Sequence, residues 1–247
     1  MRLDMWKSKR KILVLVLSLL LLISVKESKA RRDYVSYEDR DSSNTQAELS
    51  VFGRESERED KEYRGTIALT FDDGPHPVYT PELLKGLKER GVHVTFFLIG
   101  QNIDGNEEII RRMKDEGHLL GNHSQNHMQL TKEQAKEACD QINRTNEKIK
   151  EITGQTPEYV RPPYGSWSEE LECMVPMKVV LWNVDPLDWK TQNKDKIVRH
   201  IVSHVEDGSI ILLHDVYETS VEAALEVIDT LSGEGYNFVT VDELLIE

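Results

Sequence analysis

The sequence predicts an α/β protein whose single folded domain carries a parallel sheet curled into a closed or nearly closed β/α barrel. From residue 66 onward, seven short apolar segments alternate with helical patterns, and this alternation is typical of βαβ units and a parallel sheet. Polar residues gather directly after the C-terminal ends of these segments, where β/α barrels build their sites. An open doubly wound sheet is the alternative, but no glycine-rich nucleotide fingerprint follows the first strand.

The expected strands share a composition rich in Val, Ile, Leu or Phe, with Gly, Pro or Asp at their borders. Short apolar segments with such borders are typical of buried strands. They span residues 66–71, 93–99, 118–121, 159–161, 178–184, 209–214 and 237–241. Their sequences do not resemble one another, so they indicate a fold pattern and not a repeat array.

The expected helices lie between these strands and have recognisable ends. Thr80 is the expected N-cap of a helix that ends near Gly91. Residues 131–134 (TKEQ) resemble a capping box, which opens a long helix that closes before Gly154. The other expected helices span 106–116, 193–205 and 220–231, with a short one at 166–174.

The first 30 residues have the layout of a secretory signal. A basic start is followed by an almost wholly apolar run at 12–25, and small residues end at Ala30, where cleavage is expected. The run is short for a spanning helix, which needs about 20 residues. An uncleaved signal anchor, with its basic flank in the cytoplasm, is the alternative. Either way, we expect an exported protein, secreted or anchored at the extracytoplasmic face of the membrane.

Residues 31–64 form a polar linker, which has too few apolar residues to offset its ordering entropy and is expected to be disordered. It would hold the folded domain, residues 65–247, away from a membrane or wall. The formal net charge of −13 argues against nucleic acid as a partner, because phosphate binding needs clustered Lys and Arg. Nothing in the sequence indicates an obligate protein partner, so a monomer is expected.

The chain has two cysteines, Cys139 and Cys173. In an exported protein two cysteines can form one disulfide, and we predict that these two are bridged. The alternative is two separate thiols.

Asp72 and Asp73 stand where the first strand ends and a Gly-Pro turn begins. Adjacent side chains diverge at a strand end, so one carboxylate could hold a metal while the other serves as a base; an ordinary Asp-rich turn is the alternative. His123 and His127 are spaced i and i+4, which on a helical turn puts both within reach of one ion. With Asp73 they would make a His₂Asp set for one divalent metal. Zn²⁺ suits these ligands, and Co²⁺ or another divalent ion also fits.

Asp72 is then the carboxylate available as a general base. Arg161 is a candidate to hold it by a charge-assisted hydrogen bond; the alternative is a surface salt bridge, which contributes little. Two prolines make the next loop rigid, so that the backbone N–H of Tyr164 could donate to a developing oxyanion.

His214 ends an almost wholly apolar strand. A histidine in such a position is usually a hydrogen-bonded core residue, but beside a metal and an orienting Asp188 it becomes a general acid. Trp189 could wall a small acyl pocket, or simply pack. The remaining histidines are interpreted as structural or surface residues: His76, His93, His118, His200 and His204.

Five motifs in the chain resemble, in order, those of the polysaccharide deacetylases, the carbohydrate esterases with NodB homology. They are TFDDGP at 70–75, HSQNH at 123–127, RPPY at 161–164, DPLDW at 185–189 and LLH at 212–214. The resemblance covers residue 66 to about 247, and none of these positions departs from the family pattern. It implies a distorted, incomplete seven-stranded β/α (TIM-like) barrel.

The resemblance also implies a role for each matching residue. Asp72 would be the base, positioned by Arg161, and His214 the acid, tuned by Asp188. The metal ligands would be Asp73, His123 and His127. The substrate-binding groups would be the Tyr164 N–H at the oxyanion and Leu212 with Trp189 at the acetyl group.

The expected activity is removal of N-acetyl groups from amino sugars of a polysaccharide, with peptidoglycan N-acetylglucosamine as the first candidate. Chitin oligomers, an exopolysaccharide and acetylated xylan remain within the same chemistry. A non-catalytic carbohydrate-binding protein is an alternative of another class, although a binder does not need an intact base, ligands and acid. A hydrolase of small amides is a further alternative, and the short loops favour an open groove over its closed pocket.

Overall fold

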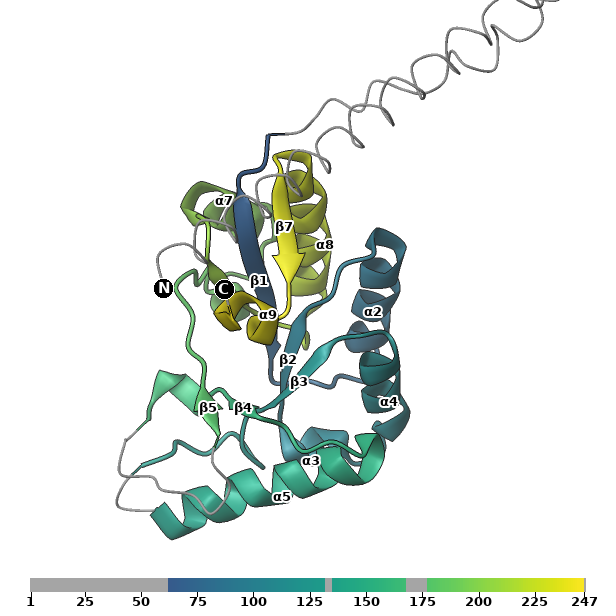
Figure 1. Ribbon diagram of the computed structural model, residues 1–247, viewed down its shortest axis with the longest axis vertical. Coiled ribbons are helices and arrows are strands. Elements are labelled where there is room, and N and C mark those ends of the chain that lie inside the picture. Colours follow the sequence, from purple (N-terminus) through teal and green to yellow (C-terminus); the bar gives the residue numbers. More distant parts are fainter. Residues whose placement is uncertain (1–61, 132–134, 168–176, 247) are drawn as a thin grey trace, which may run out of the picture. The chain divides into compact units, whose positions relative to one another are not determined.

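The computed structural model describes residues 62–131, 135–167 and 177–246 (Figure 1). The predicted signal at 1–30, most of the linker at 31–64, most of the capping box and of the short helix at 166–174, and Cys173 lie outside these residues. Within them, none of the helices combines the length and the apolar composition needed to cross a membrane. Arg64, near the start of the described residues, is hydrogen-bonded to the domain: its backbone N–H donates to the Gly235 carbonyl at 3.0 Å.

The strands form one parallel sheet in the order β5-β4-β3-β2-β1-β6, with β7 also paired to β1. They are β1 (Gly65–Asp72), β2 (Thr95–Leu98), β3 (Leu119–Asn122), β4 (Tyr159–Val160), β5 (Lys178–Val179), β6 (Ile210–His214) and β7 (Tyr236–Val239). Ala68 pairs with both β6 and β7, and Thr70 pairs with both β6 and β2. The central strand β1 therefore has β6 on one edge and shares its other edge between β7 and β2.

The sheet curls back on itself after β5. Val184 forms a parallel bridge with Ile211 of β6, and the Leu212 N–H donates to the Val184 carbonyl at 3.0 Å. The segment predicted as one strand at 178–184 thus pairs with β4 at its start and with β6 at its end. The predicted single-domain, distorted and incomplete β/α barrel is confirmed.

Helices connect the strands, and α2, α4 and α8 lie along the outer side of the sheet in Figure 1. The helical elements are α2 (Tyr79–Arg90), α3 (Gly100–Ile103), α4 (Glu107–Asp115), α5 (Ala135–Thr153), η3 (Pro163–Gly165), α6 (Asp188–Thr191), α7 (Lys194–His204), α8 (Glu218–Gly233) and α9 (Val241–Ile246). The five longer predicted helices are found close to their expected positions. The short α3, α6 and α9 were not expected.

Of the two predicted ends of α2, the C-terminal end is confirmed and the N-terminal cap is wrong. Gly91 is its C-cap in the left-handed conformation, with φ 63°. Thr80 as N-cap is wrong: the N-cap is Val78, and Thr80 lies inside the first turn. The Thr80 hydroxyl instead donates to the buried carboxyl group of Asp215.

The alternation of side chains along β1 separates an outer core from the barrel interior. Ile67, Leu69 and Phe71 pack under the outer helices, whereas Ala68 belongs to a separate interior cluster with Phe97. Thr70 and Asp72 share the interior side with Ala68. This register turns the last carboxylate of β1 into the barrel.

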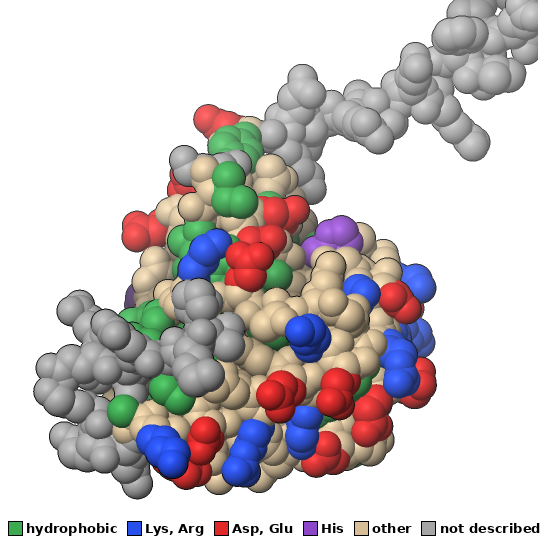
Figure 2. Space-filling view, turned by 60° about the horizontal axis from the view of Figure 1, so that its bottom comes forward, with side chains coloured by type: hydrophobic (Ala, Val, Ile, Leu, Met, Phe, Trp, Pro, Cys, Tyr) green, Lys and Arg blue, Asp and Glu red, His purple; other side chains and the backbone are tan. Residues whose placement is uncertain are grey.

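The face shown in Figure 2 carries basic and acidic side chains that are interspersed over the surface. Ion pairs among the described residues include Lys148 with Asp104 at 2.7 Å and Lys178 with Glu158 at 3.2 Å. The face drawn in Figure 2 has no continuous basic patch.

Candidate active site

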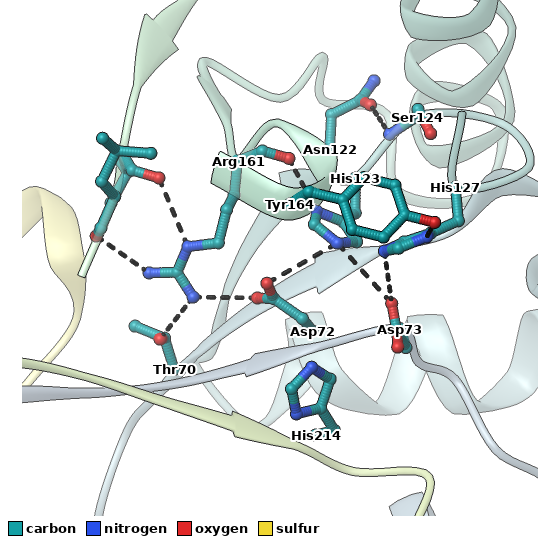
Figure 3. A network of polar contacts seen from close by, with 12 residues as sticks. Thr70, Asp72, Asp73, Asn122, His123, Ser124, His127, Arg161, Tyr164 and His214 are labelled. Carbon is teal, nitrogen blue, oxygen red and sulfur yellow. Dashed lines mark hydrogen bonds and ion pairs between the residues drawn. The ribbon is translucent and has the colours of Figure 1, made fainter. Parts of the chain in front are cut away.

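The predicted site residues gather at the C-terminal end of the sheet (Figure 3). Asp72 and His214 are the last residues of β1 and β6, and they are direct register partners. His123 and Arg161 directly follow β3 and β4. Because parallel strands end at the same edge, residues far apart in sequence meet there.

Asp73 has a left-handed backbone, with φ 72°. This conformation is uncommon for a residue with a side chain, although Asp adopts it more readily than most. The Asn102 side-chain amide donates to the Asp73 carbonyl at 2.8 Å, and the Ile99 N–H donates to the Gly74 carbonyl at 3.0 Å. The turn directs Asp73 toward the loop after β3, while Asp72 points into the barrel.

Asp73, His123 and His127 form a three-residue group that could hold a metal, with ligand atoms within 4.8 Å of one another. Asp73 Oδ1 lies 3.6 Å from His123 Nε2 and 3.5 Å from His127 Nε2. Ligands bound to one ion at 2.0–2.2 Å lie about 3.0–3.6 Å apart. Asp73 Oδ1 is also buried without a hydrogen-bond partner among the described residues. A divalent cation would supply that partner, so these residues fit a metal.

The two imidazoles are oriented by their other ring nitrogens. His123 Nδ1 donates to the Arg161 carbonyl at 2.6 Å, which leaves the Nε2 lone pair facing Asp73. His127 Nδ1 is 3.1 Å from the Tyr164 hydroxyl. Burial lowers the pKa of His127 despite the nearby Asp73 charge, and this favours the neutral imidazole that a metal needs.

The histidine pair lies on a turn and not on the helical turn expected from its spacing. Ser124 and His127 both have left-handed backbones, with φ 66° and 59°. These two residues bend the loop so that the imidazoles converge, with ring centroids 5.1 Å apart. The i, i+4 spacing therefore predicts the correct pair of histidines, but the backbone that brings them together is not helical.

Two buried amides, which sequence reasoning missed, hold this turn. Asn122 accepts the Ser124 N–H at 2.7 Å, and its amide donates to a carbonyl of α5 at 2.8 Å. Gln141 of α5 accepts the N–H groups of Gln125 and Asn126 at 3.1 and 3.0 Å. The sequence does not single out Gln141, because the buried face of α5 also carries the polar residues Thr145 and Asn146.

Arg161 is completely buried and pairs with Asp72, which is 2% exposed. Its Nη1 lies 2.8 Å from Asp72 Oδ1 and 2.6 Å from the Thr70 hydroxyl. Its remaining donors reach the carbonyls of Val180 and Leu181 at 3.3 and 3.2 Å. The alternative of a surface salt bridge is therefore wrong. The guanidinium balances the Asp72 charge inside the barrel and holds that side chain in one orientation.

His214 and Asp188 form a second pair, in which Asp188 is fully buried and His214 is partly buried. His214 Nδ1 lies 2.8 Å from Asp188 Oδ1. Asp188 Oδ2 accepts hydrogen bonds from the backbone N–H of His214 at 2.8 Å and from the Ser220 hydroxyl at 2.6 Å. Burial lowers the pKa of His214, but the hydrogen bond and charge of Asp188 outweigh it and raise that pKa to about 9. The imidazole is thus protonated at neutral pH and can donate a proton. Ser220, which supports Asp188 from α8, was not identified from the sequence.

The predicted substrate-binding residues differ in exposure. Tyr164 is 70% exposed with a left-handed backbone (φ 60°), and Trp189 is 48% exposed. Leu212 is 4% exposed and shares the interior side of β6 with His214 by strand alternation. The Tyr164 and Trp189 side chains are thus open to solvent, whereas Leu212 is buried.

Other predictions for polar residues have mixed outcomes. Cys139 lies in α5, and its bridge to Cys173 stays a prediction. His76 has a structural role, because its Nδ1 accepts the N–H groups of Val78 and Tyr79 at the start of α2, at 3.3 and 3.2 Å. His118 is buried, which lowers its pKa to about 4.

The chain resembles known deacetylases in sequence and structure. Residues 59–175 match the family model described as polysaccharide deacetylase. The chain is 47% identical over 178 residues to the peptidoglycan-N-acetylmuramic acid deacetylase PdaC of Bacillus subtilis, covering 72% of this chain and 38% of that protein. It therefore spans well under half of that relative's length. A solved structure of peptidoglycan deacetylase PdaC from Bacillus subtilis aligns with a TM-score of 0.71 and 46% identity, over 74% of this chain and 91% of that chain.

Two further proteins extend the comparison. A peptidoglycan-N-acetylglucosamine deacetylase of Bacillus cereus is 36% identical over 192 residues, covering 73% of this chain and 68% of that protein. The structure of a family 4 acetyl xylan esterase from Clostridium thermocellum, in complex with a cobalt ion, aligns with a TM-score of 0.69 and 36% identity, over 73% of this chain and 90% of that chain. By these matches, the chain belongs to the polysaccharide deacetylase family.

Proposed function

We propose that this chain hydrolyses the N-acetyl groups of amino sugars in peptidoglycan, releasing acetate and leaving a free amine. One observation carries the proposal: His123 Nε2 lies 3.6 Å from both Asp72 Oδ2 and Asp73 Oδ1. An arginine-paired carboxylate thus lies directly beside a group of side chains that fits a metal. A protein that only binds carbohydrate needs neither feature.

Asp73, His123 and His127 would hold one divalent ion, with Zn²⁺ favoured by the nitrogen and carboxylate ligands. Cobalt also suits the set, and the Clostridium thermocellum esterase contains it. Bound there, such an ion supplies a Lewis acid for the acetyl carbonyl and makes water more acidic.

Asp72 would act as general base by taking a proton from the attacking water. Its Oδ1 is occupied by Arg161 and its Oδ2 faces the metal-ligand group, so one oxygen is held while the other is available. Fixing the carboxylate in this way reduces the reorganisation needed at the moment of reaction.

His214 would act as general acid by protonating the departing amine. Asp188 keeps the imidazole charged and fixes its Nδ1–H, so that Nε2–H is the proton to be transferred. The Tyr164 backbone N–H would donate to the oxyanion, and Leu212 with Trp189 would line the acetyl group.

The substrate assignment draws on the relatives, two of which are named for peptidoglycan sugars. N-acetylglucosamine is our first candidate. N-acetylmuramic acid is the second, favoured by the 47% identity to PdaC. We further propose that residues 1–30 export or anchor the chain and that 31–64 link it to the catalytic domain at 65–247. Peptidoglycan lies on that extracytoplasmic side.

The test is an acetate-release assay on purified peptidoglycan, N-acetylchitooligosaccharides and acetylxylan, with metal-free and Zn²⁺- or Co²⁺-loaded protein. Mass spectrometry of muramidase-digested peptidoglycan then locates the free amine on glucosamine or muramic acid. We expect metal-dependent release from peptidoglycan. Binding to peptidoglycan without acetate release from any of the three substrates would support a carbohydrate-binding protein instead.

A further inference from the structure

Asp215, which follows the proposed acid His214, is a buried carboxylate that the reaction above does not use. It has no solvent exposure. Its Oδ2 accepts the Thr80 hydroxyl, and its Oδ1 has no hydrogen-bond partner among the described residues. An unpaired buried carboxylate oxygen is costly. The burial of this carboxylate directly after β6 therefore calls for a structural explanation.

The Asp215 carboxylate packs directly against the turn that carries Asp73. A Cβ added to Gly74 would lie 2.4 Å from Asp215 Oδ1 and 2.5 Å from Oδ2. A side chain at position 74 would therefore have to displace the Asp215 carboxylate. The turn and the end of β6 are therefore in contact beside the metal-ligand group.

The Thr80 hydroxyl extends this contact along the loop. Thr80 is completely buried, and its oxygen accepts the His76 N–H at 2.8 Å while its proton goes to Asp215. Asn102 fixes the other end of the turn through the Asp73 carbonyl at 2.8 Å. The segment from Asp73 to Thr80 is thus held at both ends.

This support matters because Asp73 has an unfavourable backbone. A left-handed non-glycine residue persists only where its surroundings determine it. The same conformation directs the Asp73 carboxylate toward His123 and His127. A turn free to relax would move Asp73 Oδ1 away from the two imidazoles.

We propose that Asp215 and Thr80 are positioning residues that set the turn after β1 so that Asp73 faces the two histidines. The inference rests on the proposed function in one respect, the assignment of Asp73 as a metal ligand. Both residues are fully buried, so they would act through the turn and not by contact with a substrate.

The test measures Co²⁺ affinity of the full chain by titration calorimetry, together with the visible absorption of the bound ion. Removing a support of a metal ligand typically weakens metal binding about 10- to 100-fold. We expect a loss of this size in Thr80→Val, which keeps the side-chain shape but loses the hydroxyl. Thr80→Ser keeps the hydroxyl and should bind Co²⁺ within about twofold of the parent chain, as should Thr153→Val. Thr153 is a matched control, because its buried hydroxyl is hydrogen-bonded to Ile149 of α5 and to Gln155 just after that helix, away from the metal-ligand group.

Asp215→Asn provides a second variant of nearly identical shape, in case Thr80→Val does not fold. It should also weaken Co²⁺ binding and alter the absorption bands. Parent-like Co²⁺ affinity in both folded variants would overturn the positioning role, as would an equal loss in Thr153→Val. Asp73→Ala separates this failure from that of the metal site. If Asp73→Ala also bound Co²⁺ like the parent chain, the ligand assignment itself would be wrong.

Discussion

Arg161 donates from one nitrogen to both Asp72 Oδ1, at 2.8 Å, and the Thr70 hydroxyl, at 2.6 Å, without any exposure to solvent. Thr70 and Asp72 are two residues apart in β1 and face the same side. The Arg161 guanidinium, which comes from the end of β4, therefore contacts two side chains on the interior side of β1. β4 is not a neighbour of β1 in the sheet. Arg161 reaches the proposed base because the sheet curves.

Asp72→Asn should reduce deacetylation by about 10²–10⁴-fold, the usual contribution of a positioned general base. The amide keeps the shape of the carboxylate but cannot take the proton. Metal binding should persist, because Asp73 and the histidines are unchanged. The assay is acetate release at saturating metal, with Co²⁺ titration as the control. Substantial activity in this variant would remove Asp72 from the role of base.

Arg161→Met should lower the free energy of unfolding by about 3–5 kcal/mol, because it leaves the buried Asp72 charge without its partner. Combining it with Asp72→Asn should recover part of that loss. Urea unfolding of the two single variants and the double variant gives the coupling energy. Additive losses would mean that the two side chains do not stabilise each other.

Sequence reasoning was most successful where a residue's chemistry and its place after a strand agreed. Asp73, His123 and His127 were grouped because metal ligands are few in kind and strand ends converge, and their atoms do lie together. The supporting groups Asn122, Gln141 and Asp215 were missed. Amides and carboxylates of this kind are common on surfaces, and only their burial in the folded chain reveals that they support the site.

The fold was predictable from the alternation of apolar segments, but its local detail was not. The sequence predicts one strand at 178–184, yet the start of this segment pairs with β4 and its last residue, Val184, bridges to Ile211 of β6. Thr80 fits an N-cap by residue type, but its hydroxyl donates instead to the buried carboxyl group of Asp215. In both cases a tertiary contact decided against the local preference.

His214 predicts a falling activity at alkaline pH. Its pKa is raised to about 9, so the general acid is present below that pH and is lost as the pH rises through it. Asp188→Asn removes the charge that raises this pKa, so the alkaline limb of the pH–rate profile should move to lower pH. His204→Gln, in an exposed histidine of α7, should leave the limb in place. An unmoved limb in Asp188→Asn would show that another group controls it.

The same pair should stabilise the fold in a pH-dependent way. The folded-state pKa of His214 lies above its ordinary value of 6.5. Its stabilising contribution is therefore complete below about pH 6.5 and is lost as the pH rises through about 9. Chemical denaturation between pH 6 and 10 should show a decline in that window, reduced in His214→Gln. Equal declines in the variant and the parent chain would contradict this assignment.

Metal removal should lower both activity and thermal stability. A ligand that binds only the folded chain at 100 times its Kd stabilises it by about 2.7 kcal/mol, so a chelator should reduce the Tm and abolish acetate release. Adding Zn²⁺ or Co²⁺ should restore both. Asp73→Ala should unfold at the same temperature with and without metal, because it loses the ligand oxygen that faces both histidines. His93→Gln is the matched control, since His93 lies outside the described metal-ligand group. A metal-dependent Tm in Asp73→Ala equal to that of the parent chain would place the ion elsewhere.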